Sequence, residues 1–149
     1  MNNQLFNQAY SEARTRLTLL LESMKNSDLA KKLDPSPNSI GFLLRHIGDV
    51  ELLFSKNVFH GKDIQVVAKT LIDGKDNGQW TNFEEIKAYL KHSSLLFLRT
   101  IEEQNSDSWN ELVTTKEFGT KTKSEAFGRI ISHTAYHAGQ IAVILKYGK

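Results

Sequence analysis

The sequence of 149 residues contains no cysteine. This absence excludes disulfide scaffolds, cysteine-based zinc sites, iron–sulfur clusters and a thiol nucleophile. Any metal site must therefore use nitrogen and oxygen ligands, and five histidines are present to supply nitrogen. The length is typical of one domain, so we expect a single domain over residues 1–149. A chain of this length can bury enough surface to fold without a metal or a disulfide.

The sequence also lacks an excess of charge of one sign. Nineteen Lys and Arg stand against seventeen Asp and Glu, which gives a formal net charge of +2. Such an even balance gives no reason to expect a nucleic-acid or lipid-headgroup partner. No run of 18 apolar residues exists, and residues 1–14 contain no apolar core of the signal-peptide type. We therefore expect a cytoplasmic protein with neither nucleic-acid nor membrane partners.

Proline is scarce: the only two are Pro35 and Pro37. The rest of the chain is free to form long helices. Apolar residues in steps of three and four predict an amphipathic helix over residues 3–25. After the prolines, Asn38 or Ser39 can cap a second helix over residues 39–59.

Two long connections separate the remaining helices. Residues 60–82 lack a clean period and contain Asp-Gly and Asn-Gly turn signals, so they predict a loop with one helical turn near residues 66–71. Because this loop starts at the end of the second helix, we expect it to lie over or beside a site there. Residues 105–121 form the second connection, in which residues 112–115 could pair with a strand near Phe118.

The third helix is predicted to start at Thr81 or Asn82, where Thr81 and Glu84 match a capping box. The fourth is predicted from Thr122 or Ser124 to about residue 147. Four long helices, two long connections and no convincing sheet predict an all-α four-helix bundle.

Two features of the helices favour a homodimer. The second helix is apolar nearly all round, which suggests that something covers it on more than one side, either the rest of the bundle or a second subunit. The fourth helix has a face of small residues, which would let another helix backbone approach closely. These small residues are Gly128, Ser132, Ala135, Gly139 and Ala142.

The fourth helix also carries the most informative residues, His133, His137 and Gln140. At about 100° per residue, His137 lies about 40° to one side of His133 and Gln140 about 20° to the other, so all three share a face. Two histidines at positions i and i+4 can bind one metal ion. The alternative is a pair of core histidines satisfied by hydrogen bonds. Gln140 could orient a ligand, hold an imidazole in its metal-binding tautomer, or only brace the core edge.

A third ligand must come from another helix. His46 is the best candidate because it lies at the border between the core line and the polar strip of the second helix. His60, just past that helix, and His92, far from the core line of the third, are weaker candidates. For the nearby Asp49 and Glu51 we expect solvated positions, with support of a ligand as the alternative.

The segment Ser39–Glu51, with a His followed by a Glu five residues later, and the motif His133-x-x-x-His137-x-Gly139-Gln140 together resemble the DinB-like (DinB/YfiT-like) family of small metalloenzymes. Helix order and chain length also fit. The resemblance implies a four-helix bundle that holds one divalent ion with His46, His133 and His137, usually zinc or nickel. Family members often form homodimers. Those with a known activity include transferases and isomerases that use low-molecular-weight thiols, and metal-dependent hydrolases.

Two functions are therefore open. The first is a metal-dependent enzyme acting on a small molecule, of the thiol-dependent transferase or hydrolase type, with Zn, Ni or Fe bound by nitrogen ligands. Because the chain has no cysteine, any thiol must arrive as a cosubstrate. The second is a non-catalytic, stress-related dimer that binds a metal or small ligand.

Overall fold

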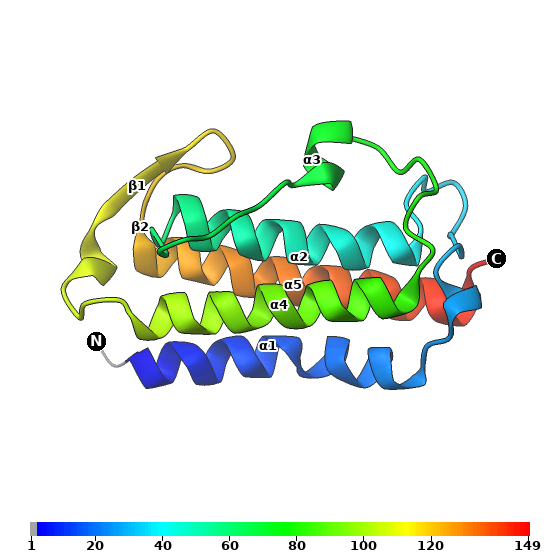
Figure 1. Cartoon of the computed structure of the whole chain (residues 1–149), viewed down its shortest axis with the longest axis horizontal. Helices are drawn as coiled ribbons and strands as arrows, with labels where there is room; N and C mark the ends of the chain where they lie inside the picture. Colours follow the sequence, from blue (N-terminus) through cyan, green and yellow to red (C-terminus); the bar gives the residue numbers. More distant parts are fainter. Residues whose placement is uncertain (1–2) are drawn as a thin grey trace.

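Four long helices lie side by side along the molecule in the computed structural model, which describes residues 3–149 (Figure 1). The helices are α1 (Asn3–Ser23), α2 (Ile40–Asn57), α3 (Lys69–Asp73), α4 (Phe83–Glu102) and α5 (Lys123–Tyr147), and the strands are β1 (Leu112–Thr115) and β2 (Gly119–Thr122). This architecture confirms the predicted all-α class and the order of its four long helices. Within residues 3–149, no helix is both long enough and apolar enough to cross a membrane.

Polar side chains fix the starts of three helices. The Ser39 hydroxyl accepts a hydrogen bond from the backbone N–H of Phe42 at the start of α2. Thr122 and Glu125 form a reciprocal capping box at the start of α5. At α4 the cap is Asn82, so the predicted capping box of Thr81 is wrong: the helix begins one residue later than that pattern requires.

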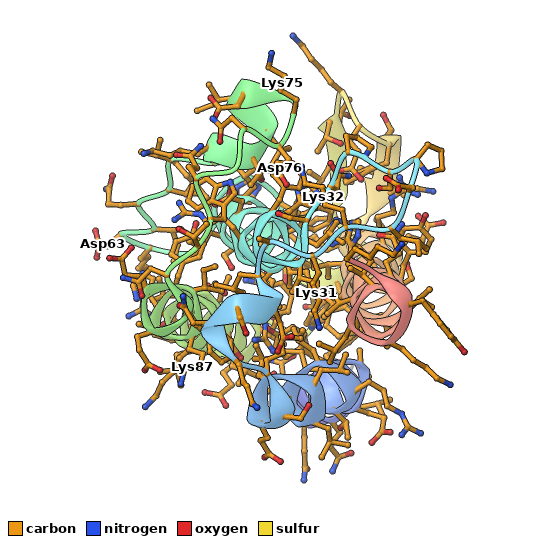
Figure 2. All side chains as sticks on the ribbon, turned by 90° about the vertical axis from the view of Figure 1, so that its right-hand side faces the viewer. Lys31, Lys32, Asp63, Lys75, Asp76 and Lys87 are labelled. Carbon is orange, nitrogen blue, oxygen red and sulfur yellow. The ribbon has the colours of Figure 1, made fainter. Side chains whose placement is uncertain are left out.

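The four long helices form a ring in which α1 packs on α4 and α5, and α2 packs on the same two (Figure 2). Their inward faces, joined by Trp109 and Val113 of the connection between α4 and α5, make two apolar clusters, one toward each end of the bundle. One includes Leu17, Ile40, Leu44, Ile47 and Ile141. The other includes Tyr10, Phe54, Phe97, Trp109 and Ile130. Buried ionic groups lie at the level where the two clusters meet.

The connection between α4 and α5 contains a small hairpin, as the possible pairing of residues 112–115 with a strand near Phe118 indicated. Strand β1 pairs antiparallel with β2, and Val113 lies opposite Lys121. The hairpin stands at the end of the bundle where α5 begins (Figure 1).

The connection between α2 and α4, which contains α3, runs along the outer side of α2 (Figure 1). It approaches so closely that a Cβ atom at Gly41 would collide with the carbonyl oxygen of Trp80. Nearly all apolar side chains of α2 are therefore buried within one chain. Of the two alternatives for the apolar second helix, cover by the rest of the chain is the one observed, and the homodimer stays a prediction.

The small-residue face of α5 is not used for close packing in the described part of the chain. A Cβ atom added at Gly128 or Gly139 would meet no atom within 4 Å. Within residues 3–149 no helix backbone approaches these two glycines closely, so the use of this face by a second subunit stays a prediction.

Candidate metal centre

The structure brings His46 of α2 together with His133 and His137 of α5. Nε2 of His46 lies 3.1 Å from Nε2 of His133. One ring nitrogen from each of the three histidines lies within 4.8 Å of the others, which is close enough to share a metal ion. His60 and His92 are exposed and lie outside this group, as their positions in the sequence suggested.

The tautomer of His46 is fixed by a residue from the connection between α2 and α4. Nδ1 of His46 lies 3.1 Å from the hydroxyl oxygen of Thr70. That hydroxyl donates its own proton to Asp49, so its oxygen must accept the Nδ1–H of His46. The Nε2 atom of His46 is then left with a free lone pair that faces His133. This contact places Thr70 beside the site, as predicted for residues 60–82, although none of these residues lines the open cavity at His133 and His137.

Asp49, which holds Thr70, is fully buried, so the expectation of a solvated carboxylate is wrong. Its Oδ2 accepts the backbone N–H and the hydroxyl of Thr70 at 3.0 and 2.8 Å. Its Oδ1 accepts Nε of Arg45 at 2.8 Å and the hydroxyl of Tyr89 at 2.6 Å. The Arg45 guanidinium in turn lies 3.6 Å from the centre of the Tyr89 ring. Four hydrogen-bond donors, one of which carries a positive charge, offset the free-energy cost of burying this carboxylate.

Gln140 holds His137 in the same way. Its Oε1 atom lies 2.6 Å from Nδ1 of His137. Since an amide oxygen can only accept, Nδ1 carries the proton and Nε2 of His137 is free. The amide nitrogen of Gln140 donates to the hydroxyl of Tyr136 at 3.2 Å. Of the roles open to Gln140 from the sequence, this geometry fits the one that holds a tautomer.

His133 leaves one polar atom unsatisfied. Its Nδ1 atom is buried and has no hydrogen-bond partner among the described residues. Its Nε2 atom lies 3.1 Å from Nε2 of His46, whose lone pair can accept only if Nε2 of His133 carries the proton, and Nδ1 of His133 is then a buried acceptor without a donor. Two nitrogens that bind one zinc ion at about 2.0–2.1 Å lie about 3.3 Å apart in a tetrahedral shell. The residues present therefore fit a shared divalent cation.

All three imidazoles are kept neutral by their surroundings. Burial, followed by the neighbouring His137 and His46, lowers the pKa of His133 to about 3. Burial and His137 lower the pKa of His46 to about 4, although Asp49 acts in the opposite direction. Burial also lowers the pKa of His137, against the effect of Gln140. Neutral imidazole is the form that binds metal ions.

Glu51 is buried as well, so the expectation of a solvated position is wrong for this residue too. Its carboxylate pairs with Arg14 and accepts hydrogen bonds from the hydroxyls of Tyr10, at 2.8 Å, and Ser93, at 2.6 Å. All three partners come from α1 and α4, and none of them is a histidine of the cluster or a residue that supports one. Glu51 therefore joins three helices of the bundle and does not support the histidines.

The histidine cluster opens onto the surface of α5. A cavity of about 400 Å³ is lined by Arg129, Ser132, His133, Tyr136 and His137. A small molecule can therefore reach the two histidines of α5 from outside. Thr70 and Tyr89, which complete the support of His46, were not found from the sequence, because nothing in their spacing relates them to a helix face that bears a histidine.

These features define a class: a helical bundle with three neutral histidines gathered beneath an open cavity. The sequence matches the model of the DinB superfamily over residues 9–141. The chain therefore belongs to the DinB superfamily, which confirms the resemblance seen in the sequence.

Among solved structures, the chain is similar to a mycothiol-dependent maleylpyruvate isomerase and to a mutant of that enzyme. In both cases the identity is 15%, the TM-score is 0.74, and the match covers 95% of this chain. The chain spans 61% of the length of these structures. At this identity the similarity shows the shared fold alone. A comparison with curated proteins gives no match.

Proposed function

We propose that His46, His133 and His137 hold one divalent metal ion, with zinc or nickel the best candidates and iron the next. The observation that carries this proposal is the convergence of three neutral ring nitrogens from two helices within 4.8 Å. Thr70 and Gln140 support it, because each turns the Nε2 atom of one histidine toward the others. Nitrogen ligands suit these metals better than Mg or Ca.

We propose further that the metal centre is catalytic and acts on a small molecule together with a low-molecular-weight thiol. A divalent ion with three histidine ligands and an open position would lower the pKa of a bound thiol or water. The cavity above His133 and His137 gives such a cosubstrate access. The similar fold of a mycothiol-dependent isomerase supports the choice of a thiol, and the absence of cysteine from this chain requires that the thiol come from outside.

In this proposal the protein's own residues bind and orient the reactants. The histidines would hold the ion that positions a thiol, and Gln140 keeps His137 in the tautomer that binds such an ion. Arg129 stands at the rim of the cavity, where its positive charge favours an anionic group on the substrate or the thiol. The Arg129 side chain also pairs with Glu117 at 3.1 Å, so an incoming anion must compete with that carboxylate.

The test is a turnover assay on zinc-, nickel- and iron-loaded protein, with cysteine, glutathione and other small thiols and an electrophile such as 1-chloro-2,4-dinitrobenzene. We expect thiol-dependent product from the wild type and none from His133→Ala. Hydrolysis of p-nitrophenyl esters without thiol-dependent turnover would instead indicate the hydrolase type. Failure of both reactions in a metal-loaded sample would favour the non-catalytic alternative, a dimeric protein that binds a metal or ligand.

A further inference from the structure

A second cavity lies next to the histidine cluster, at the end of the bundle that carries the proline linker. It has a volume of about 380 Å³. Its walls come from three places: Leu43 of α2, Val143 and Ile144 of α5, and Leu33 with its neighbours in the linker. We call this cavity the linker cleft.

The linker cleft lies beside the metal centre. Leu43 precedes His46 by three residues on α2, and Gln140 follows His137 by three residues on α5. Because the two helices run in opposite directions, both steps lead toward the same end of the bundle (Figure 1), over about 4.5 Å. Tyr136 lines both this cleft and the cavity above the histidines. The two cavities therefore meet at Tyr136, and a molecule that spans both would contact the histidines and the cleft.

The lining of the linker cleft contains no charged side chain. Four of its nine residues are aliphatic, and its polar members are the neutral side chains of Ser36, Asn38, Gln140 and Tyr136. The cavity above the histidines, by contrast, contains Arg129. The two neighbouring cavities thus differ in chemistry, with one suited to an anionic group and the other to an uncharged apolar group.

The linker wall of the cleft is held in place at both ends. Lys32 exchanges two backbone hydrogen bonds with Lys149, at 2.9 and 3.0 Å, which ties the linker to the end of α5. At the other end, the carboxylate of Asp76 accepts the backbone N–H of Ser39 at 2.8 Å. Figure 2 shows Lys32 and Asp76 at this end of the bundle. A cleft with fixed walls can bind a ligand without the cost of ordering a loop.

From this placement we propose that the linker cleft is the specificity pocket of the metal centre and binds an uncharged, apolar substituent of the substrate, carried on the group that the histidines hold. The inference rests on the proposed metal-dependent function. The cleft lies within the range of roughly 300–1,000 Å³ that is typical of small-molecule sites. An alkyl chain or a single ring matches its aliphatic lining.

Gly139 offers a way to fill the cleft without disturbing the fold. It lines the cleft, and a Cβ atom at this position would meet nothing within 4 Å. Gly128, three turns earlier on the same helix, is equally open but lines no part of the cleft. Gly139→Leu and Gly128→Leu are therefore a matched pair of test and control. Val143→Glu, which puts a charge into the cleft, is an independent second test.

The experiment uses two series of probes of increasing length. The first consists of n-alkanethiols, from ethanethiol to hexanethiol, added to cobalt-loaded protein, where binding of the sulfur gives a charge-transfer absorption band. The second consists of 1-alkanols added to metal-free, ¹⁵N-labelled protein, where amide shifts report binding. In both series we expect the wild-type affinity to rise about threefold to fourfold per methylene until the cleft is full. The rise should persist in Gly128→Leu and vanish in Gly139→Leu and Val143→Glu.

The outcomes separate this inference from the proposed function. If alkanols shift the amide signals of the residues that line the cleft, with an affinity that rises with chain length, but no thiol gives the cobalt band, the specificity pocket is supported and the proposed thiol chemistry is contradicted. If thiols bind cobalt with an affinity independent of chain length, and alkanols do not bind, the inference is overturned and the metal centre stands. Dimerisation of the wild type that Gly139→Leu abolishes would also overturn it, because the occupant would then be a second copy of the chain.

Discussion

Asp49 holds Thr70 by two hydrogen bonds to one carboxylate oxygen, and through Thr70 it orients His46. Asp49 lies on the same helix as the histidine, three residues further on, yet it acts on the imidazole through a residue more than twenty positions away in the sequence. The connection between α2 and α4 is therefore part of the metal centre and not only a cover for α2.

Thr70→Val tests this relationship directly. Loss of the hydroxyl removes the acceptor for Nδ1–H of His46, so the imidazole is no longer held in the metal-binding tautomer. We expect metal affinity to fall about 10- to 100-fold, as for other residues that support a metal ligand. Isothermal titration with zinc and a competing chelator measures the change.

The matched control is Thr100→Val, which removes another buried threonine hydroxyl, one that donates to Leu96 within α4. We expect no effect of this variant on zinc affinity. Equal affinities of Thr70→Val and the wild type would contradict the role given to Thr70.

Gln140→Leu should weaken metal binding about tenfold, because Nδ1 of His137 loses the acceptor that fixes its proton. Gln140→Glu keeps an oxygen acceptor in the same position and should retain the wild-type affinity or exceed it. Imidazole nitrogen shifts in a long-range ¹H–¹⁵N NMR spectrum of metal-free protein report the tautomer of His137. An unchanged tautomer in Gln140→Leu would show that Gln140 only braces the helix.

The stability of the metal-free protein should fall as the solution is acidified from about pH 6.5 toward pH 4. Burial lowers the pKa values of His46 and His133 to about 4 and about 3, below the ordinary value of 6.5. In this interval the unfolded chain takes up protons that the folded chain does not, and protons therefore favour unfolding. Above about pH 7.5 the imidazoles are almost entirely neutral in both states, and this contribution no longer changes.

Urea denaturation of metal-free protein at a series of pH values measures how steeply the free energy of unfolding falls as the pH is lowered. The double variant His46→Gln/His133→Gln should show a clearly smaller slope between pH 6.5 and 4. The same slope in the wild type and the double variant would mean that other groups cause the acid sensitivity.

Glu51 and Arg14 should matter for stability and not for metal binding. Arg14 is buried against the Glu51 carboxylate, so Glu51→Leu leaves a buried guanidinium without its counter-charge. We expect a loss of about 3–5 kcal/mol in the free energy of unfolding, with part of it recovered in the double variant Arg14→Met/Glu51→Leu. Chemical denaturation measures the free energy of unfolding of both variants. Loss of bound zinc from the folded double variant would contradict the view that the Glu51–Arg14 pair is separate from the histidine cluster.

Most of the fold could be predicted from the sequence, because the helices have apolar residues at regular spacing and polar caps at their starts. The shared face of His133 and His137 follows from the same periodicity. The positions of Thr70 and Tyr89 could not be predicted, since contacts across the connection and across α4 depend on tertiary packing. The burial of Asp49 could not be predicted for the same reason: a carboxylate on the polar strip of a helix is expected to be solvated unless the segment that covers it is known.

The apolar second helix does not by itself require a homodimer. Residues 60–82 and two neighbouring helices cover its apolar faces within one chain, and its pattern from the sequence cannot distinguish this cover from that of a second subunit. The number of subunits stays a prediction for analytical ultracentrifugation.

The central claim is that three histidines hold one divalent ion, and the most direct test is the metal content of three purified proteins, measured side by side by mass spectrometry. Wild type and His92→Ala should each contain close to one equivalent of zinc, nickel or iron, because His92 is exposed and outside the cluster. His137→Ala should retain a folded bundle and lose most of its metal. Equal metal in all three proteins, or none in the wild type after incubation with each ion, would contradict the claim.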